Sequence, residues 1–165
     1  MIIFDIISKE KQTLFFMIAF EVKKFQDFSV DMLYRILHLR AEVFVLEQQC
    51  IYQDVDFKDQ QALHVLGYLQ NELVAYARIY REEDYKSGVS IGRVLVLEKF
   101  RKLNYGHSLM NFIKTTIDSN FKDCTICISA QLYLISFYTS HGFVAKGEEY
   151  LEDGIPHIAM QFIKK

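Results

Sequence analysis

The chain has 165 residues, with 21 acidic and 19 basic side chains and a formal net charge of -2. Hydrophobic residues make up 51% and aromatic residues 15%, which excludes a disordered chain, and the length suits one domain with a substantial core. Because the charges balance, the composition argues against a nucleic-acid-binding protein, which usually carries a basic excess.

The N-terminal residues 1–16 carry two apolar patches separated by charged residues. The apolar run from Leu14 to Phe20 is too short to span a bilayer, and neither a basic start nor a small-residue cleavage site indicates a signal peptide. We expect an N-terminal extension over residues 1–16 and a single domain over residues 17–165, located in the cytoplasm. The extension precedes a natural start at Met17, adds a strand, or forms an arm that binds a partner or a membrane surface; the sequence leaves these readings open.

The spacing of apolar residues predicts a mixed sheet with helices on both faces. The expected elements, in chain order, are an edge strand over 20–28, a helix capped by Ser29 or Asp31 that runs through 33–44, an acidic loop over 48–61, strands 62–69 and 73–80 as a hairpin, a solvated loop over 81–88, a strand over 89–97, a helix from Asn104, a strand over 124–129, a short helix over 131–140, and strands 143–151 and 157–162 joined by a turn over 152–156.

The cysteines do not predict a metal site or a disulfide framework, because their number is odd. Cys124 and Cys127 lie three apart in an expected strand, so they point to opposite faces, and no second pair or suitably spaced histidine follows. We expect buried, reduced thiols. The acidic loop lacks the glycine and the closing glutamate of a calcium loop.

The strand, turn and helix between Gly92 and Ile117 predict an anion-binding site. Basic residues precede the helix, Asn104 is a good N-cap that tolerates left-handed backbone angles, and Gly106 removes a side chain from the first helical turn. The free N–H groups and the positive dipole at a helix N-terminus attract phosphate. An ordinary helix behind a solvated basic loop is the alternative that these residues leave open.

Two motifs resemble the GNAT superfamily of acyl-CoA-dependent N-acetyltransferases. Arg101-Lys102-Leu103-Asn104-Tyr105-Gly106 is similar to its Arg/Gln-x-x-Gly-x-Gly/Ala coenzyme A loop, with Asn104 in place of the first glycine. Phe137-Tyr138-x-x-x-Gly142-Phe143 is similar to its F-Y-x-x-x-G-F passage. Further segments resemble the ElaA-like branch, namely residues 40–48, 50–56, 72–78, 91–94 and 152–157.

The resemblance implies the GNAT acyl-CoA N-acyltransferase fold, an α/β (α+β) arrangement with a mixed central sheet of six or seven strands flanked by helices. It implies an acyltransferase that uses acetyl-CoA, without a metal, to acetylate a primary amine of a small molecule or peptide by direct attack. It implies that the coenzyme contacts Leu95, Val96, Arg101, Lys102, Leu103, Asn104, Tyr105, Gly106, His107 and Gln131. By the same resemblance, Tyr138 is the general acid, and Leu95 and Val96 supply main-chain groups to the pantetheine arm and the oxyanion.

The general base stays open between His64, Glu47 and water. His64 is equally well a structural histidine, and Glu47 is by default a surface carboxylate. His157 is expected to fix the turn after Pro156. The three arginines Arg40, Arg78 and Arg93 are structural ion partners or a clamp for an acidic group, and the acidic tracts 54–59 and 148–153 either attract an amine or form solvated loops. A non-catalytic acyl-CoA sensor on the same fold is the alternative function, and a homodimer is expected by analogy only.

Overall fold

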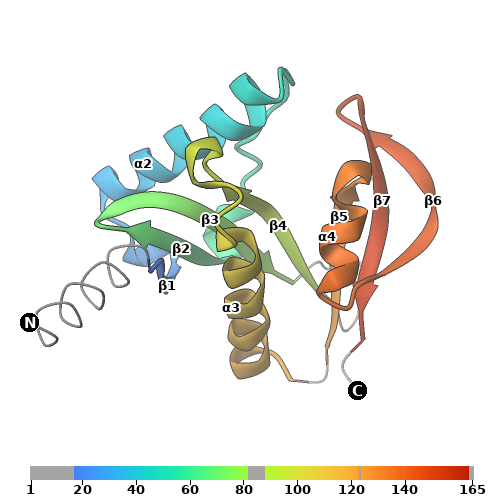
Figure 1. Ribbon diagram of the computed structural model, residues 1–165. Coiled ribbons are helices and arrows are strands. Elements are labelled where there is room, and N and C mark those ends of the chain that lie inside the picture. Colours follow the sequence, from blue (N-terminus) through green and yellow to red (C-terminus); the bar gives the residue numbers. More distant parts are fainter. Residues whose placement is uncertain (1–16, 82–87, 123, 164–165) are drawn as a thin grey trace, which may run out of the picture.

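The computed structural model describes residues 17–81, 88–122 and 124–163, and the predictions for residues 1–16 and 82–87 lie outside these ranges. Seven strands form one mixed sheet in the order β1-β2-β3-β4-β5-β7-β6 (Figure 1). Their bounds are β1 Ala19–Lys24, β2 Leu63–Leu69, β3 Glu72–Tyr80, β4 Gly88–Val96, β5 Thr125–Gln131, β6 Val144–Glu152 and β7 Ile155–Phe162. The expected mixed sheet of six or seven strands is confirmed, with seven.

Helices cover both faces of the sheet, as the sequence predicted. The helix α2, Val30–Arg40, continues into a π-helix over Ala41–Glu47, and α3, Tyr105–Asn120, and α4, Ile135–Ser140, follow later in the chain. Short 3-10 turns cover Phe25–Asp27, Asp59–Gln61, Glu98–Phe100 and Leu132–Leu134. Ser29 is the N-cap of α2, because its side chain accepts a hydrogen bond from the Met32 N–H at 3.1 Å.

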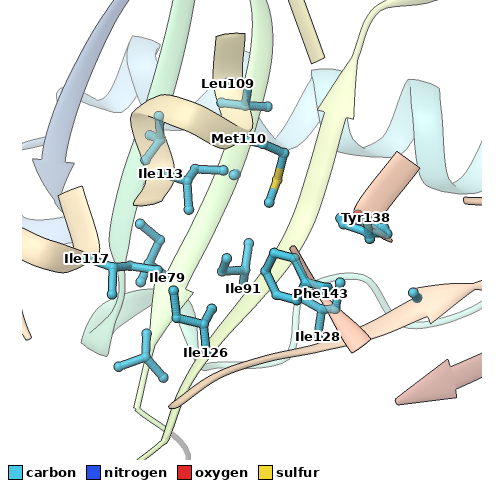
Figure 2. Packing of buried hydrophobic residues seen from close by; sticks show 14 of the residues in the cluster. Ile79, Ile91, Leu109, Met110, Ile113, Ile117, Ile126, Ile128, Tyr138 and Phe143 are labelled. Carbon is cyan, nitrogen blue, oxygen red and sulfur yellow. The ribbon is translucent and has the colours of Figure 1, made fainter. Parts of the chain in front are cut away.

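Two hydrophobic cores lie on opposite faces of the sheet. The larger core receives the apolar stripe of α3, in which Leu109, Met110, Ile113 and Ile117 are fully buried. Figure 2 shows this stripe above Ile79, Ile91 and Ile126 of the sheet. The smaller core packs Ile36, Leu39 and Val43 of α2 and the π-helix against Leu66, Leu73, Tyr76, Leu95 and Leu97. Each helix is therefore held by the burial of one apolar face.

The strands β4 and β5 pair over a short stretch only and then part. They are parallel neighbours, and their register covers residues 88–90 of β4 and 125–127 of β5. All other neighbouring strands are antiparallel and pair over longer stretches. The sheet thus divides into two parts, as Figure 1 shows. The left part contains β1, β2, β3 and β4, and the right part contains β5, β7 and β6.

A β-bulge interrupts β4 beside this gap. Tyr76 of β3 faces Leu95, and Arg78 faces Gly92, so that two residues of β4, Arg93 and Val94, oppose one residue of β3. Arg93 takes a left-handed φ of 53°, which is unusual for a residue other than glycine. A bulge bends a strand and redirects its side chains. Here it separates the paired start of β4 from its end at Val96.

Several boundaries differ from the sequence prediction, and three of the differences have a clear physical reason. The first strand ends at Lys24, because a 3-10 turn over Phe25–Asp27 follows. Gln131 is the last residue of β5 and does not begin a helix. The β6–β7 turn needs only Asp153 and Gly154, with φ of 50° and 79°, because a two-residue turn with both φ positive matches the twist of a hairpin. Ile155 and Pro156 therefore belong to β7.

A buried network of arginines and aspartates fixes the acidic loop over residues 48–61 against the sheet. Arg40 is 1% exposed, its Nε donates to Asp54 at 2.9 Å, and its Nη1 donates to Asp59 at 2.9 Å. Arg78 donates to Asp56 at 2.6 and 2.7 Å and to Asp59 at 2.9 Å, and Arg93 donates to Asp54 at 2.6 Å. The arginines are thus structural ion partners, the first of the two roles that the sequence left open.

We predict that Arg40→Ala destabilises the protein by about 3 to 5 kcal/mol, because Asp54 and Asp59 stay buried after they lose a charged partner. Urea unfolding at pH 7 measures this loss. Arg35→Ala is the matched control on the same helix, since Arg35 is 62% exposed and pairs with the exposed Asp31. The control is expected to change stability by less than about 1 kcal/mol. Equal effects of the two substitutions would contradict a structural role of the network.

Candidate functional site

A cavity of about 930 Å³ occupies the gap between the diverging parts of β4 and β5. The end of the π-helix, the N-terminus of α3, the α4 segment and the β6–β7 hairpin complete its walls. The structure brings most of the sequence-predicted site residues together here: Glu47, Leu95, Val96, Arg101, Lys102, Asn104, Tyr105, Gly106, His107, Gln131 and Tyr138. Leu103 and His64 do not line the cavity.

The N-terminus of α3 opens onto this cavity. Asn104 is the N-cap in the left-handed conformation, with φ 63° and ψ 8°, and its main-chain oxygen accepts the Ser108 N–H at 3.0 Å. The N–H groups that precede Ser108 in the first turn have no partner within the helix. Asparagine tolerates the left-handed region better than most residues, so it replaces glycine here without changing the course of the chain.

Gly106 lies in this first turn, and the packing around it does not require a glycine. A Cβ placed on Gly106 would meet the ring of Phe137 at 3.6 Å, which is an ordinary van der Waals distance. The protein interior therefore has room for a side chain at this position. The absent side chain instead leaves the cavity side of the helix end open to a close approach by an anion.

Arg101 and Glu47 are engaged with each other. The guanidinium donates to both carboxylate oxygens of Glu47 at 2.6 and 2.7 Å, and its Nε donates to the Val96 carbonyl at 2.8 Å. The hydrogen bonds that Arg101 donates to Glu47 raise the pKa of Arg101, so the guanidinium stays charged. Arg101, which was predicted to bind phosphate, and Glu47, which was a candidate base, thus form one ion pair on the cavity wall. Each side chain restrains the other.

Tyr138 presents a hydroxyl to the cavity from α4. The residue is 6% exposed, its ring packs edge-on against Phe137 and Phe143, and its hydroxyl makes no hydrogen bond within the described part of the chain. Burial, and after it the neighbouring Tyr133, raise the pKa of Tyr138, so the phenol keeps its proton at neutral pH. An unpartnered hydroxyl on a residue that lines a cavity is suited to meet a ligand atom.

Gln131 closes one rim of the cavity. Its Nε2 donates to Oε1 of Gln48 at 3.1 Å and so connects the end of β5 to the end of the π-helix. Gln48 is not among the residues that the sequence predicted for the site. The pairing depends on residues 83 positions apart, and no local pattern signals it.

His64 lies in the interior of β2, away from the cavity. It is 0% exposed, its Nδ1 accepts the Tyr76 hydroxyl at 2.7 Å, and its Nε2–H donates to the Asp59 carbonyl at 2.9 Å. Both ring nitrogens are therefore in use, and burial lowers the pKa of the imidazole. The geometry favours the structural reading of His64 over the reading as a base.

The right wall of the cavity is polar. The Tyr150 hydroxyl and Ser129 Oγ are 2.5 Å apart, and Ser129 Oγ donates to Glu152 at 2.5 Å. His157 also lines this wall, and its Nδ1–H donates to the Ile155 carbonyl at 2.8 Å, which agrees with the expected role in the turn. Its place in the cavity was missed, because the sequence showed only that it follows Pro156.

The acidic loop is not a free negative surface. Both carboxylate oxygens of Asp56, which lines the cavity, accept hydrogen bonds from Arg78. The expectation that this tract attracts an amine therefore finds no support, since its charges are compensated. The second acidic tract contributes Glu152 and Asp153 to the cavity wall.

Within the described ranges, no cluster of three or more metal-ligating side chains occurs, and no helix is long and apolar enough to cross a membrane. The side chains of Cys50, Cys124 and Cys127 are buried, as expected, and form no disulfide within the described part of the chain.

Comparison with known proteins places the fold among known acyltransferases. Residues 25–164 match the family model of the acetyltransferase (GNAT) domain. Protein ElaA of Escherichia coli is 43% identical over 146 residues, which cover 87% of this chain and 95% of ElaA. Its crystal structure superposes with a TM-score of 0.83 and covers 88% of this chain and 99% of that chain.

Two further solved structures are similar. An acyl-CoA N-acyltransferase from Pseudomonas aeruginosa is 36% identical, with a TM-score of 0.83 and coverage of 88% of this chain and 99% of that chain. An acetyltransferase from Bacillus subtilis, solved in complex with CoA, is 17% identical, with a TM-score of 0.63 and coverage of 90% and 100%. The second similarity concerns the fold alone.

We predict that protein stability falls as the pH falls through about 6.5, the pKa of an unfolded histidine. The pKa of native His64 is lowered, so the unfolded chain binds its proton first, and stability rises with pH in this range. Urea unfolding between pH 8 and pH 5.5 should give a shallower slope for His64→Asn than for the wild type. His141, whose pKa burial also lowers, accounts for part of the remaining slope. An unchanged slope would contradict the assignment.

Proposed function

The chain belongs to the GNAT acyltransferase family, and from this premise we propose that it transfers an acetyl group from acetyl-CoA to a primary amine of a small molecule or peptide. One observation carries the proposal. The open N-terminus of α3 and the unpartnered hydroxyl of Tyr138 line the same cavity between β4 and β5. The family match over residues 25–164 supports a single domain over residues 17–165.

The helix terminus suits the pyrophosphate of coenzyme A. The N–H groups of Gly106 and His107 belong to the first turn of α3, where the helix dipole is positive and the missing side chain leaves room. Arg101 and Lys102 line the cavity beside this turn and add positive charge. Since Arg101 is bound to Glu47, a phosphate at this position either shares the guanidinium or displaces the carboxylate.

The edge of β4 suits the pantetheine arm. Beyond Ser90 the strand has no partner in β5, so its main chain faces the cavity along Leu95 and Val96. An extended chain can add to such an edge through main-chain hydrogen bonds. A main-chain N–H in this region would also stabilise the oxyanion that develops on the thioester.

The chemistry requires a neutral amine and a proton for the departing sulfur. A primary amine with a pKa near 10.4 is neutral at pH 7 in only about one molecule in a few thousand. After deprotonation, the nitrogen attacks the thioester carbonyl, the C–N bond forms and the C–S bond breaks. We assign Tyr138 as the acid that protonates the thiolate. The nitrogen then gives its second proton to the Tyr138 oxygen, which restores the phenol.

We predict that Gly106→Ala weakens coenzyme A binding at least about tenfold, because a methyl group enters the approach to the free N–H groups. The fold should tolerate the methyl group, and the free energy of unfolding should change by less than about 1 kcal/mol. Isothermal titration calorimetry with coenzyme A measures the affinity. Ser119→Ala, at the exposed end of the same helix, is the control and should bind as the wild type does. A wild-type protein that is folded and binds no coenzyme A would overturn the proposed function.

We predict that Tyr138→Phe lowers kcat by about a hundredfold and leaves the affinity for coenzyme A unchanged, because the phenol acts on the leaving thiolate and not in binding. Stability should be retained, since the hydroxyl has no hydrogen-bond partner among the described residues. The release of free thiol from acetyl-CoA with a panel of primary amines measures kcat. Tyr34→Phe on the exposed face of α2 is the control. Tight binding without thiol release by the wild type would indicate the non-catalytic sensor instead.

A further inference from the structure

His157 is held in one orientation and one tautomer. Its Nδ1 must carry the proton, because the partner at 2.8 Å is the Ile155 carbonyl oxygen, which can only accept. In the neutral ring, Nε2 then carries the lone pair. The ring of Tyr150 stacks on the imidazole at a centroid distance of 6.2 Å and an interplanar angle of 23°. Nε2 makes no hydrogen bond to another described residue.

The sheet directs this imidazole to the cavity. Successive residues of a strand point to opposite faces. In β7, Ile158 and Met160 belong to the main core, and His157, Ala159 and Gln161 line the cavity, which Met160 also reaches. His157 faces Gln131 in β5 and Tyr150 in β6, so it lies where the gap between β4 and β5 is open. His157 is only 8% exposed, and it lines the cavity.

Other candidates for a base are already committed to protein partners. His64 is buried outside the cavity with both nitrogens bonded. Glu47 is bonded through both oxygens to Arg101. The other histidine on the cavity wall, His107, is bonded through Nδ1 to Nε2 of His141 at 2.9 Å. Of these side chains, only His157 combines a tautomer that its partner fixes with a second ring nitrogen that makes no hydrogen bond within the described ranges.

We propose that Nε2 of His157 is the general base that removes the proton from the acceptor, and that the acceptor is a primary ammonium group. The inference rests on the proposed function and deepens it. The N–H bond of the ammonium breaks and its proton passes to Nε2, which gives a neutral amine and an imidazolium. The amine attacks the thioester as described above, and the imidazolium returns its proton to solvent after the product leaves.

The wall around His157 suits a cation. Tyr150 donates to Ser129, because Ser129 itself donates to Glu152, so the polar chain ends on the carboxylate of Glu152. A carboxylate on the same wall favours a positive charge nearby, both on the entering ammonium and on the imidazolium that forms. A negatively charged acceptor would gain nothing from this wall.

The test compares nucleophiles that differ in whether they need a base. His157→Asn keeps an amide N–H for the Ile155 carbonyl and removes the base, and His38→Asn on the exposed part of α2 is the matched control. We measure kcat/KM at pH 7 with the best primary alkylamine of a panel and with hydroxylamine, which is largely neutral at this pH. We expect His157→Asn to lose about a hundredfold with the alkylamine and less than about threefold with hydroxylamine. Added imidazole should restore part of the lost rate.

A merely structural histidine would lower both rates alike and would not respond to imidazole, and this outcome overturns the proposal. A measurement that needs no acceptor is the ¹⁵N spectrum of the histidine-labelled chain, in which the His157 signals are assigned by comparison with His157→Asn. Neutral His157 with its proton on Nε2 also overturns the proposal. Absence of coenzyme A binding by the wild type would instead overturn the proposed function, so the two failures are distinguishable.

Discussion

The parting of β4 and β5 after residues 88–90 and 125–127 is the constraint on which the rest of the structure depends. Two parallel strands that continued to pair would close the sheet and bury both edges. Since they diverge, main-chain groups of β4 and side chains of β5 face a cavity that the N-terminus of α3 also enters. The large apolar core below α3 keeps both parts of the sheet together at the paired end (Figure 2). The gap is therefore a fixed feature of the fold.

The arginine–aspartate network holds one wall of this gap. Arg93 carries the positive φ of the bulge, and Asp54 binds its guanidinium at 2.6 Å, so the acidic loop restrains the irregular part of β4. The same network neutralises the aspartates of the loop. The burial of Asp56 opposes its ionisation, but the hydrogen bonds from Arg78 dominate and lower its pKa to about 2. The network thus supports the walls and leaves recognition to other groups.

The two parts of the sheet place different polar groups around the cavity. The left part supplies the helix terminus and the Arg101–Glu47 pair, which suit an anion. The right part supplies Glu152, which suits a cation, and the open nitrogen of His157. In the proposed reaction, an anionic coenzyme and a cationic acceptor would meet opposite sides of this cavity, which Tyr138 of α4 also lines.

The sequence by itself determined the order of the main elements, the helices on both faces of the sheet and the Asn104 cap with Gly106 behind it, because periodicity, caps and glycines are local signals. It named His64 as a candidate base and assigned His157 only to the turn after Pro156, because neither burial nor the cavity can be read from the sequence. Only the tertiary structure decided that His64 is enclosed by Tyr76 and the Asp59 carbonyl, whereas His157 reaches the cavity. It also decided that Arg101 binds Glu47, 54 positions away in the chain. Such pairings depend on where the sheet brings distant segments, and no sequence window contains that information.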